Sequence, residues 1–216
     1  MKPIFDELIQ PMMQTFAVDL IAEIISSERD NQVQIARKMG KNADWIKKYI
    51  DFEVKNHEFR SPSEDSMACI YIYFTRSDYD GSQTMSKLPS TNQLVIEAFA
   101  SGENDLFDEH CVKTSSDTVA DIRLDYLVSQ IKQIMMSEAA ENIRIKAGIS
   151  STILKSTERT FYPEKENISK SVMSQKIIFE LDFNEKTKYL TGTKIKELYI
   201  QNHIRDELFS ILITDL

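Results

Sequence analysis

The segment from Ile177 to Phe183 limits the possible folds more than any other part of the chain. Its odd-numbered positions are all large and apolar, and two of the three positions between them are acidic. Successive side chains of a β-strand point to opposite faces, so this alternation predicts a strand with one buried face. A buried sheet face needs other elements to cover it, and amphipathic helices can do so. The positions expected to face helices are Ile177, Phe179, Leu181 and Phe183.

Two segments carry broad apolar stripes at the three- and four-residue spacing of an amphipathic helix. The first runs from about Pro11 to Glu28. The second begins at Asp117, which we expect to be the N-cap, and reaches about Ala140. The helix positions expected to face the sheet are Leu20, Ile24, Leu124 and Ile131.

Three other segments have the composition of strands. Ile70 to Phe74 and Leu94 to Phe99 are rich in aromatic and aliphatic residues and predict a hairpin with a long loop, Arg76 to Pro89. Ile153 to Tyr162 is rich in Ser and Thr, which predicts an exposed or edge strand paired with the strand that ends at Phe183. The order helix, insert, hairpin, helix, hairpin and tail predicts an α+β domain. We expect a mixed, largely antiparallel sheet with two main helices packed on one face.

The remaining segments give weaker patterns. A short helix ended by Gly40, a turn capped by Asn42, and an alternating strand from Ile50 to Val54 can be proposed for the variable insert 29–66. Residues 105 to 116 are acidic and polar, and we expect them to be irregular. The predicted organisation is one domain over residues 1–184 and a C-terminal extension or arm over 185–216. The periodicity of the arm fits a helix and a strand equally well.

Charge and targeting signals exclude several classes of protein. The chain has 216 residues and a formal net charge of -8, so it gains no counterion-release affinity for a nucleic-acid backbone or an anionic membrane. Cys69 and Cys111 lack the spacing of a disulfide framework, which favours a reducing compartment. The N-terminus lacks the pattern of a signal peptide, and the longest nearly apolar window, Phe16 to Ile25, is short of the ~20 residues of a spanning helix. We therefore expect no membrane partner.

The sequence predicts no catalytic, cofactor or metal site. The five glycines are scattered, so neither a Walker loop nor a dinucleotide-binding loop is present. Asp78 and Asp80 could ligate a hard cation, but the remaining ligands of an EF-hand loop are missing. His110 and Cys111 are adjacent in sequence, and such neighbours rarely point at each other, so a solvated loop is favoured over a nucleophile and its base.

Tyr71 alternates with apolar residues in the expected strand and, with Tyr73, could stack nucleic-acid bases. Few lysines and arginines surround the pair, which favours a second packed face or a subunit contact instead.

The ordered set of segments resembles the tail terminator family of long-tailed bacteriophages, the minor tail protein U-like proteins. The resemblance is carried by Ala68 to Tyr79, Leu94 to Gly102, Asp117 to Asp125 and the strand that ends at Phe183, and it covers about residues 5 to 184. It implies a homo-oligomeric ring, usually a hexamer, that caps the tail tube and ends its polymerisation. Such a ring also provides the surface to which the head attaches.

The same resemblance implies the partners and the location. The partners would be further copies of the chain, the tail tube protein and a neck or connector protein. DNA would pass through the lumen without specific binding, which an acidic lining suits. The location would be the virion, at the tail end of the neck, after assembly in the host cytoplasm. The alternatives are a head-tail neck or connector protein, a non-viral protein-protein adaptor and an enzyme of unknown type.

We hypothesise that two segments mediate assembly. The loop from Arg76 to Pro89 is long for a simple turn and could reach a neighbouring subunit. The arm from Lys186 to Leu216 carries apolar residues that would be an aggregation liability if they stayed in water. The candidate interface residues are Arg76, Asp78, Tyr79, Asp80, Lys87, Ile195, Leu198, Ile200, Leu208 and Phe209.

Overall fold

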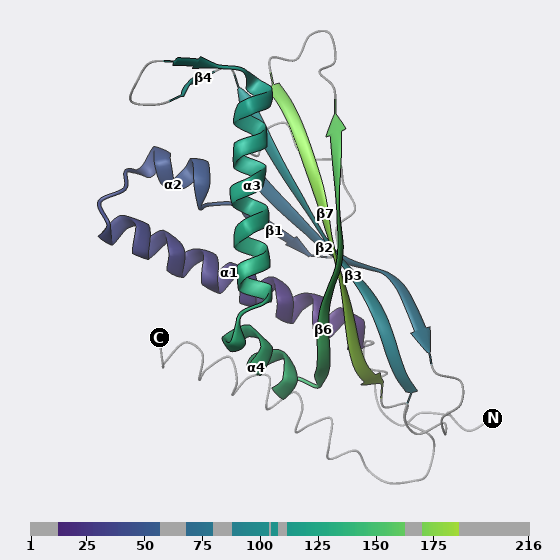
Figure 1. The fold of residues 1–216 in the computed structure, drawn as a ribbon. Coiled ribbons are helices and arrows are strands. Elements are labelled where there is room, and N and C mark those ends of the chain that lie inside the picture. The colour runs from purple at the N-terminus through teal and green to yellow at the C-terminus, as the bar shows by residue number, and fades with distance from the viewer. Residues whose placement is uncertain are drawn as a thin grey trace, which may run out of the picture.

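The computed structural model describes residues 13–56, 68–79, 88–103, 105–107, 112–162 and 170–185 (Figure 1). Along the described chain, runs of helices are followed by runs of strands, which is the order of an α+β fold. The helices are α1 Met13–Lys38, α2 Ala43–Tyr49, α3 Ser116–Met135 and α4 Glu138–Lys146. The strands are β1 Glu53–Asn56, β2 Ala68–Tyr79, β3 Leu88–Glu103, β4 Asp105–Phe107, β5 Val112–Thr114, β6 Ile149–Tyr162 and β7 Lys170–Glu185.

The main sheet is mixed and largely antiparallel, which confirms the predicted fold class. It has five strands in the order β1-β2-β3-β7-β6, and β4 and β5 form a separate two-stranded sheet. The two predicted hairpins, β2-β3 and β6-β7, are joined side by side through the antiparallel pair β3-β7. β1 is parallel to β2. β6 lies at the edge of the sheet, as its Ser and Thr content predicted.

A single large core cluster contains side chains from both main helices and from alternate positions of the strands. Phe179 shows why the alternation matters: it lies opposite Leu94 on β3 and Leu154 on β6, and its side chain is fully buried. Burying a side chain of this size stabilises the fold by about 1.5–3 kcal/mol. The eight core positions predicted above are all buried, namely Leu20, Ile24, Leu124, Ile131, Ile177, Phe179, Leu181 and Phe183.

The backbone of α3 comes unusually close to β3 at Gly102. A Cβ atom at this position would lie 2.0 Å from the carbonyl oxygen of Ser116 and 2.5 Å from the backbone nitrogen of Ala120. The buried Arg123, one turn further along α3, donates a hydrogen bond to the carbonyl of Ser101 on the same strand. Gly102 therefore allows the first turn of α3 to rest directly on the sheet.

The strands are longer than their apolar patterns indicated. The predicted loop from Arg76 to Pro89 is wrong at both ends, because β2 continues to Tyr79 and β3 begins at Leu88. Tyr79 pairs with Ser90 in the ladder, so polar positions that resemble a loop are held by backbone hydrogen bonds. β7 likewise begins at Lys170, before the apolar alternation that starts at Ile177.

A polar side-chain network supports this end of the sheet. Gln14 on α1 donates through Nε2 to Asn92 Oδ1 at 3.1 Å and also to the hydroxyl of Ser77. Asn92 is fully buried and donates in turn to the hydroxyl of Ser90 at 2.7 Å. Buried polar groups are tolerated when they are hydrogen-bonded, so these polar residues fit within the strands.

Several helix boundaries also differ from the predictions. α1 does not end near Glu28 but continues through the expected short helix to Lys38. The N-cap of α3 is Ser115, not Asp117, because the Ser115 hydroxyl accepts the Thr118 N–H. α3 ends at Met135, and a new cap at Ser137 starts α4, so one helix to Ala140 is wrong.

Two further corrections concern strands. The expected strand from Ile50 to Val54 forms only in part: β1 spans Glu53–Asn56, and the buried Phe52 precedes it. The segment 105–116, expected to be irregular, contains β4 and β5. Among the described helices, none is both long enough and apolar enough to span a membrane.

Candidate interaction surface

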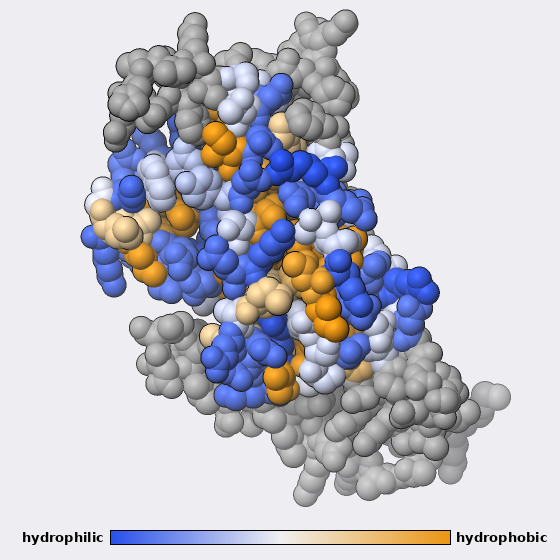
Figure 2. All heavy atoms as spheres, viewed as in Figure 1, coloured by the Kyte–Doolittle hydropathy of each residue, from blue (hydrophilic) through white to orange (hydrophobic). Residues whose placement is uncertain are grey.

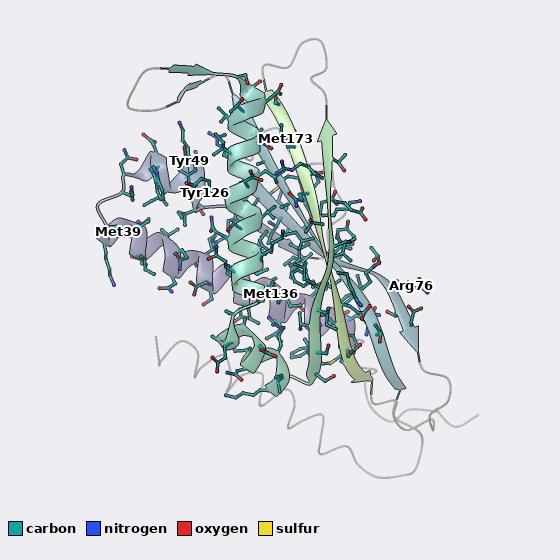
Figure 3. All side chains as sticks on the ribbon, in the orientation of Figure 1. Met39, Tyr49, Arg76, Tyr126, Met136 and Met173 are labelled. Atoms are coloured by element: carbon teal, nitrogen blue, oxygen red, sulfur yellow. The ribbon has the colours of Figure 1, made fainter. Side chains whose placement is uncertain are left out.

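Only part of the predicted interface lies within the described residues. Arg76 and Asp78 occupy exposed positions near the end of β2, and Arg76 Nε lies 2.9 Å from Asp78 Oδ2. Figure 3 places Arg76 at the far right of the sheet, away from both α2 and α3. Tyr79 is the last residue of β2. The residues outside the described part are Asp80, Lys87, Ile195, Leu198, Ile200, Leu208 and Phe209.

Cys69 is buried on the second face of the sheet, next to Tyr71 and Phe99. Burial raises the pKa of the Cys69 thiol to about 11, although the nearby Lys55 acts in the opposite direction. Burial also raises the pKa of the Tyr71 phenol. A thiol with this pKa is neutral near pH 7, and a neutral thiol is a weak nucleophile, so Cys69 acts as a core residue. His110 and Cys111 lie outside the described residues.

Tyr73 also takes part in a packed polar arrangement. Its hydroxyl donates to Glu97 Oε2 at 2.9 Å, and Lys176 Nζ lies 4.0 Å from the other oxygen of Glu97.

In the part of the chain that the structure describes, no three His, Cys, Asp or Glu side chains gather as a metal site would require.

The C-terminal half of α1 and the whole of α2 form a helical hairpin that projects from the body of the protein, which is the sheet and the helices packed on it (Figure 1). Figure 1 shows the C-terminal half of α1 running away from the sheet to the left of α3, with α2 returning above it. We call residues 29–49 the projecting hairpin. Its buried positions are few compared with the first half of α1, where Ala17 to Ile25 are mostly buried.

The turn of the projecting hairpin has a defined geometry. Gly40 has a φ of 79°, a left-handed conformation that favours glycine. The Lys41 N–H donates to the Ala36 carbonyl at 3.0 Å and the Gly40 N–H to the Arg37 carbonyl at 3.0 Å, which is the Schellman arrangement. The Asn42 side chain then accepts the Trp45 N–H at 2.7 Å and caps α2. The predicted stop at Gly40 and cap at Asn42 are therefore confirmed.

The base of the projecting hairpin is fixed to the body. Arg29 Nη1 donates to the Phe52 carbonyl at 2.7 Å, and its guanidinium lies 5.8 Å from the centre of the Phe52 ring. From α3, Gln130 Nε2 donates to the Tyr49 carbonyl at 2.6 Å. The rings of Tyr49 and Tyr126 also meet, with centroids 4.9 Å apart. These contacts give the hairpin a set direction.

The far part of the projecting hairpin exposes apolar side chains. Met39 is 71% exposed, and Ile35 on the preceding turn is 39% exposed. Tyr126 on α3, whose ring contacts Tyr49 at the base of the hairpin, is 46% exposed. Figure 2 shows hydrophobic side chains at the left end of the molecule bordered by hydrophilic ones, at the place where Figure 3 labels Met39.

The same part of the hairpin is basic, although the whole chain is acidic. Residues 37–48 contain five Lys or Arg and one Asp, a net charge of +4. The whole chain carries -8, so the remaining residues carry -8 minus +4, which is -12. The Lys41 ammonium lies 4.8 Å from the centre of the Trp45 ring, and that ring is 5.2 Å from the Tyr49 ring. Charge and apolar surface therefore coincide at one end of the molecule.

This surface was not among the predicted site residues. The sequence contained two signals for it: a cluster of basic residues in an acidic chain, and the single tryptophan beside that cluster. Comparison of the chain with models of known protein families gave no match, and comparison with characterised proteins gave none either. Any function of this chain must therefore be inferred from its own residues and geometry.

Proposed function

We propose that this protein is a structural subunit that assembles with copies of itself into a ring capping a bacteriophage tail tube. In that role it would end tail polymerisation and provide the surface for head attachment. The observation that carries the proposal is the projecting hairpin. Its base is fixed to the body by hydrogen bonds and ring contacts, and it presents apolar and charged side chains beyond the core of its own domain, as expected for a subunit that makes contacts with neighbours.

The arrangement of elements also supports this proposal. The segments on which the resemblance to tail terminators rests correspond to β2, β3, the start of α3 and β7, and these elements pack together in one sheet-and-helix unit. A ring requires each subunit to use two different surfaces, one for each neighbour. The projecting hairpin lies at one end of the molecule and the exposed end of β2 at the other, as Figure 3 shows for Met39 and Arg76.

The net charge of -8 is compatible with a lumen through which DNA passes. An acidic wall repels phosphates, so DNA would slide past without being held. In this proposal the partners are the neighbouring subunits, the tail tube protein and the neck or connector protein.

Electron microscopy of the purified full chain in negative stain tests the proposal most directly. We expect closed rings of uniform diameter, and light scattering should give one assembly whose mass is an integral multiple of 25.0 kDa. Single compact particles at all concentrations would refute self-assembly and would favour an adaptor.

Rings alone would not separate a terminator from a neighbouring neck protein. A terminator should bind the ends of purified tail tubes and stop their elongation when it is added during polymerisation. Rings that bind phage heads and leave tube length unchanged would favour the neck or connector alternative.

A further inference from the structure

We propose that the tip of the projecting hairpin, residues 35–48, is the element that docks on a second copy of the chain, where it binds an acidic surface. This inference rests on the proposed self-assembly and names the surface responsible for it. The surface differs from the interface predicted from sequence, which lay in the 76–89 segment and the C-terminal arm.

The turn at the tip has an ordered backbone. A Schellman turn at Gly40 and the Asn42 cap lock the connection between α1 and α2, so Met39 is displayed on an ordered turn. Met39 is the most exposed of the large apolar side chains in the described chain. A backbone that is already ordered loses little conformational entropy on binding, so the cost of docking this turn is mainly that of ordering the Met39 side chain.

The tip and the rest of the chain have opposite net charges. The tip has a net charge of +4 over residues 37–48, and all other residues together carry -12. Outside its own tip, a second copy therefore has a net charge of the opposite sign, and opposite charges steer two proteins together and select their orientation. Arg37, Lys38, Lys41 and Lys47 are all exposed and can reach such a partner.

The side chains of the tip favour a protein partner over a nucleic acid. Binding to a single strand combines basic groups with aromatic faces open to base stacking. Here the Lys41 ammonium already lies over the Trp45 ring, and Tyr49 packs beside it. The most exposed large apolar side chain at the tip is Met39, which has no favourable interaction with phosphate. A protein surface fits this combination better.

Site-specific photo-crosslinking of the full chain tests where the contact lies. A photo-reactive amino acid is placed at Met39 in one sample and at Met136 in another. These two positions carry the same residue and are both largely exposed, at 71% and 58%, but only Met39 belongs to the tip. Irradiation should give crosslinked dimers from Met39 only, and mass spectrometry should locate the second site in an acidic segment.

Charge reversal tests the physical cause. The variant K41E/K47E should raise the dissociation constant for self-association at least about tenfold, and K41Q/K47Q should have a smaller effect. Lys146→Glu on α4 is the matched control, because this exposed lysine lies outside the tip. Raising the salt concentration from about 0.05 M to about 0.5 M should weaken the wild-type assembly and leave K41E/K47E nearly unaffected. Circular dichroism should show the same helix content in all of these variants.

The outcomes distinguish this inference from the proposed function. Wild-type rings that crosslink through Met136, or that persist in K41E/K47E, would refute the docking role of the tip and leave the ring intact. A wild-type chain that stays monomeric would refute both. Tip-dependent binding of a labelled single-stranded oligonucleotide, with unaltered self-association, would reassign the tip to nucleic acid.

Discussion

Replacing Gly102 by alanine should destabilise the protein strongly, although it adds only one methyl group. The added Cβ would lie 2.0 Å from the Ser116 carbonyl oxygen and 2.5 Å from the Ala120 nitrogen. Both are backbone atoms in the first turns of α3, so no side-chain rotation can relieve the contact. The helix must move away from β3, and this movement disturbs the buried bond between Arg123 and the Ser101 carbonyl.

The expected magnitude follows from two opposing terms. Overpacking typically costs about 1–3 kcal/mol, and a clash between two backbone segments belongs at or above the upper end of that range. Alanine also lowers the conformational entropy of the unfolded chain, which stabilises the folded state by about 0.4–1 kcal/mol. We therefore expect Gly102→Ala to lower the free energy of unfolding by at least about 2 kcal/mol, as measured by urea denaturation.

Gly40→Ala provides the matched control. Gly40 has a φ of 79° and nothing within 4 Å of the added methyl group, so only the left-handed backbone opposes the substitution. That conformation costs an alanine about 1–2 kcal/mol. If Gly102→Ala unfolds at the same urea concentration as the wild type, α3 does not rest on β3 as described.

Three further predictions concern the core. Phe179→Ala should cost about 3–5 kcal/mol in urea denaturation, because the ring is fully buried, and an unchanged midpoint would place this strand face in solvent. Burial raises the pKa of the Cys69 thiol from 9.0 to about 11, so the unfolded chain loses this proton first. Stability should therefore fall as pH rises from 9.0 to about 11, and Cys69→Ala should reduce that fall; an identical pH profile would contradict the burial. Arg144→Leu leaves the Met135 carbonyl without its 2.7 Å donor and should lower the free energy of unfolding by about 1–3 kcal/mol in the same assay. A variant as stable as the wild type would show that the cost of burying the Arg144 charge in the wild type cancels the gain from this hydrogen bond.

The sheet and the main helices could be predicted because their signals come from burial. Phe179 and its apolar neighbours alternate, and Leu124 and Ile131 recur at helical spacing, since each faces one shared core. The polar ends of the strands gave no such signal. Arg76 and Asp78 continue β2 through backbone pairing with β3. Backbone hydrogen bonds do not depend on the type of side chain, so the sequence pattern does not reveal them.

The projecting hairpin was harder to predict for a related reason. Arg29, Asp30 and Asn31 interrupt the apolar stripe because α1 leaves the core at this point, although the helix itself continues. Gly40 and Asn42 could be assigned from sequence because left-handed turns and N-caps depend on local chemistry. The exposure of Met39 could not be predicted from sequence, because methionine in a helix usually fills a gap in the core.

The pairing of β3 with β7 has a consequence for how the chain is made in the cell. The closest partners in this ladder, Glu103 and Lys170, are 67 positions apart in sequence (170 minus 103). A ribosome adding about 5–20 residues per second needs about 3–13 s to cover that distance. During this time β3 can pair with β2 alone, and its other edge stays open to strands of neighbouring nascent chains. Faster translation between the two strands should raise the soluble yield, and rare codons placed there should lower it.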